Sequence, residues 1–279
     1  MSQQKYTLHT HTIRFDGQNT IAEMVAQAKT SGFDTIGISN HFIVNPAIKN
    51  SKLYKYSVIG GYYYIYSSSF KEAIAKFKFH YKEIEKVRQL YPEMRILRGM
   101  EVDFFDNDEW KSEFDKTIKF LKPDYIIGSA HFVEQDGLLL NTHDWKVATP
   151  EKQKKILERY WTNVANAANS GLFNWMAHLD LPKKVGLGYD VQWTNFEKMA
   201  VESAAKSGTG IEINTSFYDR GDAPYPSERI LNMVKQYDVP VLISDDAHNI
   251  QNIGRHFDKA SDLIKQLNLR TFDIDSITR

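Results

Sequence analysis

Short apolar runs in this chain repeatedly end in residues that can bind a metal ion. The first run, within YTLHTHTIRFDG (residues 6–17), ends in His9 and His11, with Asp16 five positions further on. The later runs end in the following residues: His41, Glu101, His131, His178 with Asp180, Asn214, and Asp246 with His248. Neutral imidazoles and ionised carboxylates are ligands that zinc, manganese and iron share. The pattern therefore predicts a site for divalent metal ions.

The runs that carry these residues have the composition of short buried strands. They are KYTL, DTIGIS, MRILRGM, YIIGSA, FNWMA, GIEIN and VPVLIS. Helical patterns separate them. Thr20 and Glu23 have the spacing of a capping box, before a helix that ends near Gly32, and Thr194 with Glu197 repeats the device. Further helices are predicted at about 70–90, 108–121, 150–169, 227–237 and 255–267.

Seven runs that alternate with helices predict parallel β–α units, and hence an α/β barrel of seven units. An open doubly wound sheet is the alternative. The C-terminal ends of barrel strands meet at one mouth, so the metal-binding residues would converge there. Because side chains alternate along a strand, Asp246 rather than Asp245 would face the same side as His248. The remaining histidines, His80, His143 and His256, lie away from any predicted strand end and are expected to be outside the site.

One step between successive runs, from GISNHF to ILRGME, is much longer than the others. We expect residues 1–279 to form one domain with an insertion at about 43–94. The segment 51–70, SKLYKYSVIGGYYYIYSSSF, is rich in tyrosine and carries paired glycines. It is predicted to be either a mobile lid over the site or an ordinary surface loop.

The composition excludes several classes of function. Basic and acidic residues both number 35, so no overall basic field favours nucleic acid or an anionic membrane. The chain has no cysteine, which excludes disulfides and thiolate chemistry. There is no signal-peptide pattern and no apolar run of the roughly 20 residues that a membrane span needs. A cytoplasmic protein with no nucleic-acid or membrane partner is expected, and the sequence does not indicate an oligomeric state.

Six segments of the chain together resemble a known family. HTHTIRFDG, GISNH, RGMEVD, IGSAHF, MAHLD and SDDAH match, in this order, the metal-binding motifs of the polymerase and histidinol phosphatase (PHP) family. The resemblance extends from His9 to His248. It implies a distorted seven-stranded (β/α)7 barrel, with the metal site at the C-terminal ends of the strands. The contexts IGSAHF, HLDLPKK and IEINTSFYDR are most similar to the stand-alone histidinol-phosphate phosphatases of the family.

The resemblance also implies a ligand set for two or three divalent ions, with zinc the first expectation and manganese or iron the alternatives. It groups His9, His11, Glu101 and Asp246 around one ion. Glu101 would bridge to a second ion that His131 and His178 also hold. Asp16, His41 and His248 would hold a third. Two positions depart from the family pattern, since Asp16 stands where histidine is frequent and Asn40 where aspartate is common.

Such a centre suits the hydrolysis of a phosphate ester. Three divalent ions carry six positive charges and the three carboxylates remove three, so the centre would attract a phosphate dianion. The resemblance implies a phosphomonoesterase that converts L-histidinol phosphate to L-histidinol and phosphate.

Specific roles follow for residues around the centre. Glu101 and Asp246 would act in catalysis at the metals, and Asp180 could protonate the leaving alcohol. Guanidinium groups match phosphate oxygens, so Arg220, Arg159 and Arg14 are candidate substrate-binding residues. A phosphodiesterase or exonuclease acting on nucleotides, an esterase for another small phosphate ester, and a non-catalytic metal-binding module are the alternatives.

Overall fold

The computed structural model describes residues 4–277 and shows strands at every one of the seven apolar runs. The strands are β1 (Tyr6–Thr7), β2 (Thr35–Ile38), β5 (Arg95–Arg98), β7 (Ile127–Ser129), β10 (Trp175–Met176), β11 (Gly210–Asn214) and β12 (Val241–Ser244). These strands pair only in parallel within the described chain. The predicted α/β class is therefore confirmed.

Two of these strands break and resume, which the sequence analysis does not predict. After β2 the chain continues as β3 (His41–Val44), and after β5 it continues as β6 (Glu101–Asp103). The breaks divide the parallel strands into a sheet of order β1-β2-β5 and a sheet of order β12-β11-β10-β7-β6-β3-β4, where β4 is Tyr66–Ser67. In the second sheet His41 is the register partner of Glu101. The breaks thus place two of the predicted metal ligands side by side.

Hydrogen bonds beyond the ends of the strands bring the first strand against the last. Thr10 forms a parallel bridge with Ala247. The amide of His11 donates to the carbonyl of Ala247 at 2.8 Å, and the amide of Ala247 donates to the carbonyl of His9 at 3.0 Å. The segment after β1 therefore lies directly beside the segment after β12, and their polar residues meet.

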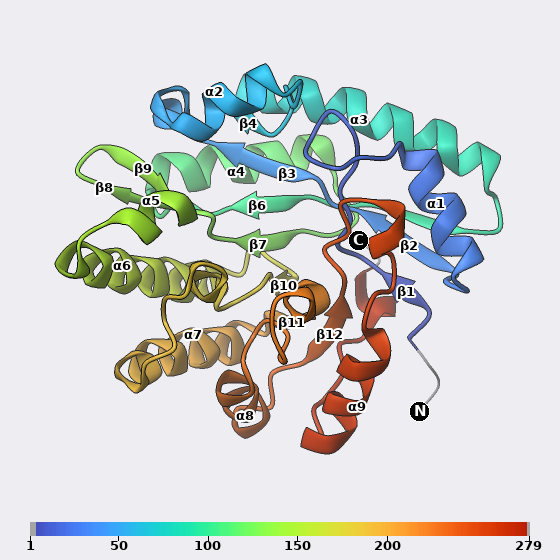
Figure 1. Cartoon of the computed structure of the whole chain (residues 1–279). Coiled ribbons are helices and arrows are strands. Elements are labelled where there is room, and N and C mark those ends of the chain that lie inside the picture. Colours follow the sequence, from blue (N-terminus) through green and yellow to red (C-terminus); the bar gives the residue numbers. More distant parts are fainter. Residues whose placement is uncertain (1–3, 278–279) are drawn as a thin grey trace.

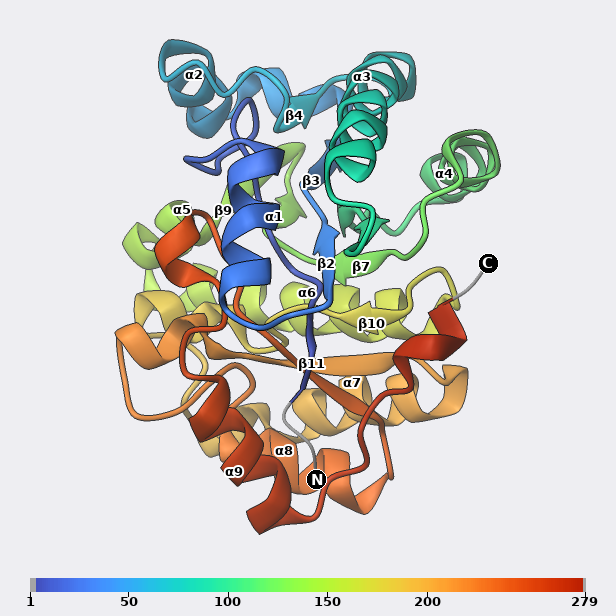
Figure 2. The same cartoon turned by 90° about the vertical axis from the view of Figure 1, so that its right-hand side faces the viewer.

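The long helices lie around the outside of the strands (Figures 1 and 2). They are α1 (Ile21–Thr30), α3 (Phe70–Leu90), α4 (Asp108–Leu121), α6 (Pro150–Asn169), α7 (Thr194–Ser207), α8 (Glu228–Gln236) and α9 (Phe257–Leu267). The capping box of Thr20 and Glu23 is confirmed. The one predicted at Thr194 is wrong, because a 3-10 turn at Val191–Trp193 runs straight into α7. Within residues 4–277, no helix combines the length and apolar character that crossing a membrane requires.

Shorter elements gather on one side of the molecule. The predicted insertion contains a 3-10 turn at Pro46–Asn50, α2 (Lys52–Ile59) and β4. A second excursion, the antiparallel hairpin of β8 (Phe132–Gln135) and β9 (Leu138–Asn141), leads into α5 (Thr142–Val147). In Figure 1 both groups lie toward the side at which the arrowheads of β3, β6 and β7 point. The lid function and the single-domain organisation stay predictions.

A tyrosine closes the interior on the side of β1. The Tyr125 hydroxyl donates to the carbonyl of Leu8 at 2.6 Å, and its ring stacks on Trp175 with 5.0 Å between centroids. Gly37 and Gly99 lie against this ring, and a Cβ at these positions would come within 2.0 Å and 2.3 Å of its atoms. Glycine at both positions is therefore needed for the ring to fit.

We expect Gly37→Ala to destabilise the fold by about 1–3 kcal/mol, because the added methyl group overpacks the Tyr125 site. Urea unfolding followed by circular dichroism measures the change, with Thr30→Ala, at an exposed position of α1, as the control. An unchanged unfolding midpoint would show that the ring has room to move.

Candidate metal centre

The nine predicted metal ligands form one continuous cluster, and the carboxylate of Glu101 lies at its middle. Glu101 is fully buried at the start of β6. Imidazole nitrogens of five histidines lie within 3.6 Å of its two oxygens. They belong to His9, His11, His41, His131 and His178. Segments spread over residues 9–178 thus deliver side chains to a single carboxylate.

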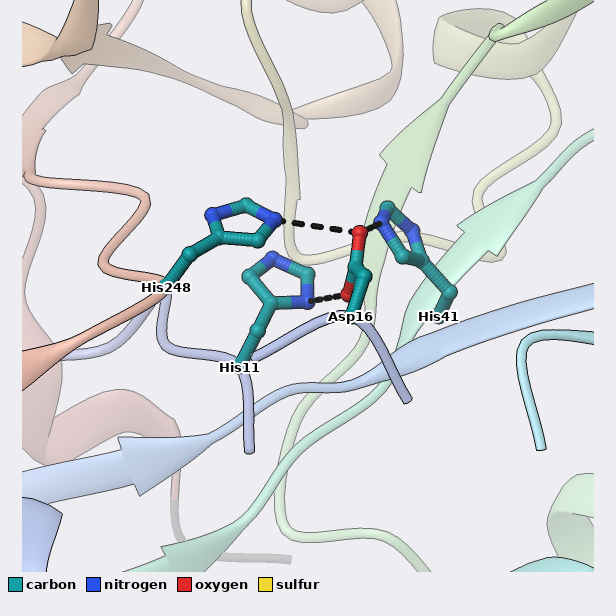
Figure 3. A group of neighbouring side chains, drawn as sticks. All are labelled: His11, Asp16, His41 and His248. Atoms are coloured by element: carbon teal, nitrogen blue, oxygen red, sulfur yellow. Dashed lines mark hydrogen bonds and ion pairs between the residues drawn. The ribbon is translucent and has the colours of Figure 1, made fainter. Parts of the chain in front are cut away.

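Two further carboxylates complete the cluster. Asp246 Oδ1 lies 3.2 Å from His11 Nε2 and 3.6 Å from both His9 Nε2 and His248 Nδ1. Asp16 lies between His11, His41 and His248, with its oxygens 3.5, 3.0 and 3.1 Å from their nitrogens (Figure 3). Asp245 points elsewhere and accepts from the Thr7 hydroxyl and the Gly254 amide, so the choice of Asp246 from side-chain alternation is confirmed.

Eight of the nine residues form three groups that share members. Within each group, the potential ligand atoms lie within 4.8 Å of one another. One contains His9, His11 and Asp246, another His41, Glu101 and His131, and the third His11, Asp16, His41 and His248. These groups overlap with those implied by the resemblance but are not identical. His41 takes the place of His178 beside Glu101 and His131, although His178 Nε2 still lies 3.1 Å from Glu101 Oε1.

Unpartnered polar atoms test whether this set fits a metal. Several buried atoms of the cluster have no hydrogen-bond partner among residues 4–277. They are His9 Nε2, His11 Nδ1 and Nε2, His41 Nδ1, Asp16 Oδ1 and Glu101 Oε2. His41 Nδ1 lies 2.8 Å from Glu101 Oε2 without the geometry of a hydrogen bond. Each buried unsatisfied group costs about 1–3 kcal/mol. Divalent cations among these atoms would satisfy all of them at once, so the residues fit a metal centre.

The electrostatics of the cluster favour ionised carboxylates and bound positive charge. Burial lowers the pKa of the cluster's histidines, but neighbouring carboxylates outweigh it and raise the pKa of His9, His41, His178 and His248. Burial alone would raise the pKa of Asp16, but the imidazoles of His41 and His248 hold that pKa well below its usual range. The same competition between burial and neighbouring histidines leaves the pKa of Glu101 and of Asp246 well below the usual value. Burial, together with His248 and His41, lowers the pKa of His11 to about 4. The carboxylates are therefore ionised and His11 is neutral.

Carboxylates behind the cluster orient its histidines. His9 Nδ1 lies 2.9 Å from Glu212 Oε2, and His131 Nδ1 lies 2.7 Å from Asp103 Oδ2. Such contacts fix the ring orientation and the tautomer of a ligand. The sequence analysis missed both residues. A signal was present for each, since Glu212 interrupts the apolar run GIEIN and Asp103 stands two positions after Glu101.

Asn40, one of the two departures from the family pattern, supports the loop after His11. Its Oδ1 accepts from the Thr12 amide at 2.8 Å. Its Nδ2 donates to the Thr12 hydroxyl and to His80 Nε2, at 2.9 and 3.0 Å. Burial lowers the pKa of His80 to about 3, so this imidazole is a neutral acceptor. Asn40 thus holds the backbone beside His11.

A cavity of about 580 Å³ opens over the cluster. His41, His131, His178, Asp246 and His248 form part of its floor. Three basic residues, Lys184, Arg220 and Arg255, line it together with the apolar side chains of Leu53 and Ile65 from the insertion. The cavity is therefore large enough for a small organic phosphate, and its basic side chains lie beside the carboxylates of Asp16, Asp219 and Asp246.

The structure brings one of the three candidate arginines to this cavity. Arg220 lines it, whereas Arg159 lies beside another hollow and donates to the carbonyl of Glu134 at 2.7 Å. Arg14 lies over the ring of Phe79, at 4.6 Å from its centroid, outside the cavity. Arg255 was not predicted. It lines the cavity and donates to the carbonyls of Asp245 and Asp246, which fixes the backbone next to a metal ligand.

Asp180 and His143 are placed differently from expectation. Asp180, the predicted proton donor, is not among the residues that line the cavity, and its Oδ2 accepts from the Ser227 amide at 2.9 Å. His143, expected to be outside the site, lines the cavity. It lies in α5, which follows β9, a strand that the sequence analysis did not identify. A signal existed in the sequence, because the dipeptide Asp136-Gly137 is typical of a type I′ hairpin turn, and the structure gives these residues φ of 54° and 73°.

Comparisons with known proteins identify the family. A model of the PHP domain matches residues 6–216, so the chain belongs to the PHP family. The resemblance inferred from the six motifs is therefore confirmed. A probable histidinol-phosphatase of Deinococcus radiodurans is 29% identical over 193 residues, covering 68% of this chain and 72% of that protein. A probable phosphatase of Acetivibrio thermocellus is 21% identical over 263 residues, covering 94% of this chain and 86% of the relative.

Solved structures share the fold. A structure described as a putative histidinol phosphatase of Listeria monocytogenes matches with a TM-score of 0.73 and 20% identity, covering 91% of this chain and 99% of the other. The histidinol phosphate phosphatase of Lactococcus lactis, in complex with zinc, L-histidinol and phosphate, matches with a TM-score of 0.70 and 16% identity, covering 97% and 96%. The predicted enzyme class, a hydrolase, agrees with the names of these proteins.

Glu101→Gln should remove most of the bound divalent metal from the purified protein, because the central carboxylate loses its charge while its shape is kept. Metal content is measured by inductively coupled plasma mass spectrometry after passage over a chelating resin. Glu83→Gln, at a partly exposed position of α3 and paired with Lys86, is the control. Equal metal content in the two variants would contradict the central position of Glu101.

Proposed function

We propose that this PHP-family protein is a metal-dependent phosphomonoesterase. One observation carries the proposal. The nine clustered ligand residues lie at a cavity that Lys184, Arg220 and Arg255 also line. Bound divalent ions would supply a nucleophile of lowered pKa and neutralise charge on the phosphoryl oxygens. A phosphate dianion would thus meet positive charge from the floor and from the wall of the cavity.

Arg220 is the residue best placed to bind the phosphate group. Its backbone is fixed by the hydrogen bond from its amide to the carbonyl of Phe217, at 2.8 Å. Its guanidinium makes no hydrogen bond or ion pair with any residue between 4 and 277, so its donors are free for a ligand. Arg255, in contrast, already donates hydrogen bonds to the carboxylate of Asp219 and to the backbone carbonyls of Asp245 and Asp246.

The proposed substrate is L-histidinol phosphate, which would be hydrolysed to L-histidinol and phosphate. The names of the relatives from Deinococcus radiodurans and Lactococcus lactis support this choice. The cavity has a size and a lining that suit it, since Tyr66, Phe132 and Tyr225 offer aromatic surface for an imidazole ring. We propose two or three bound ions, with zinc favoured by the ligand set and by the zinc-bound relative.

Phosphate release tests the proposed activity directly. Purified protein loaded with zinc or manganese should hydrolyse L-histidinol phosphate at least about a hundredfold faster, in kcat/KM, than the diester bis(4-nitrophenyl) phosphate, because only a dianion matches the charge of the site. Turnover of the diester with no reaction of the monoester would replace the proposal with a phosphodiesterase.

Arg220→Ala should raise KM for the phosphate ester about tenfold and change kcat less, because a charge-assisted contact to the bound phosphate is lost. Arg159→Ala is the matched control, since this arginine lies outside the cavity and should leave both constants near those of the unmodified protein. Equal effects of the two substitutions would remove Arg220 from the phosphate site.

A further inference from the structure

The segment between β11 and α8, residues 215–227, forms one wall of the cavity and is called the cavity loop below. Ser216, Asp219, Arg220 and Tyr225 of this loop line the cavity. Two hydrogen bonds close the loop near its ends. The Asn214 amide donates to the carbonyl of Tyr225 at 2.7 Å, and the Tyr225 amide donates to the carbonyl of Asn214 at 2.9 Å. The position of Arg220 therefore depends on what supports the interior of this loop.

A buried lysine from another part of the chain fills that interior. Lys183, in the 3-10 turn Leu181–Val185, is only 5% exposed. Its Nζ donates to the carbonyl of Pro224. The same atom lies 4.5 Å from the ring centroid of Phe217 and 4.6 Å from that of Tyr225. One ammonium group thus contacts both arms of the cavity loop.

Asp180 joins this lysine and fixes the end of the loop. Its Oδ2 lies 3.3 Å from Lys183 Nζ and accepts from the Ser227 amide at 2.9 Å. Asp180 stands two positions after His178, a residue of the metal cluster. The pair therefore connects the turn that follows a metal ligand to both the middle and the end of the loop that carries Arg220.

Packing alone does not explain a charged pair at this place. A buried lysine carries a desolvation cost that an apolar side chain would avoid, so a gain in stability does not by itself account for the pair. The charge of Lys183 instead allows contacts that an apolar side chain cannot make. The ammonium donates to one carbonyl and lies near two aromatic rings of the loop, so loss of its charge would weaken three contacts of the loop at once.

We infer that Lys183 and Asp180 are positioning residues that hold the cavity loop, and with it Arg220, in the place where the phosphate of the substrate binds. The expected change in KM rests on the proposed function, whereas the expected support of the cavity loop does not. It assigns a role to a buried ion pair that does not line the cavity, and it replaces the predicted role of Asp180 as proton donor.

Lys183→Met and Asp180→Asn test this inference, because both keep the approximate shape of the side chain and remove its charge. Hydrogen–deuterium exchange should show faster exchange of the amides of Arg220, Gly221, Tyr225 and Ser227, all of which are hydrogen-bonded. Metal content should be unchanged. KM for the phosphate ester and the inhibition constant of inorganic phosphate should each rise about tenfold, with a smaller change in kcat.

Lys111→Met is the matched control, because Lys111 also pairs with a carboxylate, Asp106, and lies near an aromatic ring, Phe104, but away from the cavity. It should leave loop exchange and KM unchanged. A fall in kcat with an unchanged KM in Asp180→Asn would instead support the proton-donor role and overturn the inference.

The exchange measurement needs no substrate, so it separates the two proposals. If the unmodified protein does not hydrolyse L-histidinol phosphate, the proposed function fails, and loop exchange still decides the role of the pair. Exchange in residues 215–227 equal to that of the unmodified protein, in a variant whose melting curve shows it to be folded, would contradict the inference. If Lys183→Met does not fold, Asp180→Asn gives the same readout with a smaller perturbation.

Discussion

The burial of the Glu101 carboxylate among five imidazoles is the constraint on which the rest of the structure depends. A fully buried carboxylate is costly unless positive charge and donors surround it. Here the partners come from the segments after β1, β7 and β10 and from the start of β3. None of these segments can shift without leaving the carboxylate less compensated. Contacts between the Glu101 carboxylate and the imidazoles therefore connect the C-terminal ends of the strands, in addition to the hydrogen bonds between strands.

Charge is layered around that carboxylate. Behind the histidines, the acceptors Glu212 and Asp103 fix ring orientation. In front of them, the cavity wall carries the basic side chains of Lys184, Arg220 and Arg255. Because Asp219 pairs with Arg255 in the same wall, an anion in the cavity would meet the positive charge of Lys184 and Arg220 beside the ligand cluster. The same layering makes a neutral substrate a poor match, because it would leave the charge of the centre unbalanced.

The sequence predicts the seven strands, the class of fold and the residues that converge, because the composition and spacing of short segments can be read from the chain itself. It does not predict the breaks between β2 and β3 and between β5 and β6, since those depend on how neighbouring strands pair. It places Arg159 and Arg14 among the candidates because composition shows an arginine but not its direction. His143 and Arg255 are missed because His143 lies in the short helix α5 after an unpredicted hairpin and Arg255 in the turn before α9, and the sequence does not show that either faces the cavity.

Residues that support the site are less visible in the sequence than residues that form it. Metal ligands recur at strand ends, which makes a pattern. Lys183 is part of the segment HLDLPKK, but its role follows only from its contacts with Phe217, Tyr225 and Pro224. Asp180 shows the same limit. Its type and position suggest proton transfer, but its contacts suggest support of the backbone.

Anomalous X-ray scattering tests the central claim most directly. Crystals grown with zinc, measured on both sides of the zinc absorption edge, should show peaks at about 2.0–2.2 Å from nitrogens and oxygens of the cluster, at least one of them bound to Glu101. Two or three peaks among these side chains would agree with the account. A structure without anomalous density at Glu101, or with the imidazoles of His9, His41 and His131 turned away from it, would contradict it.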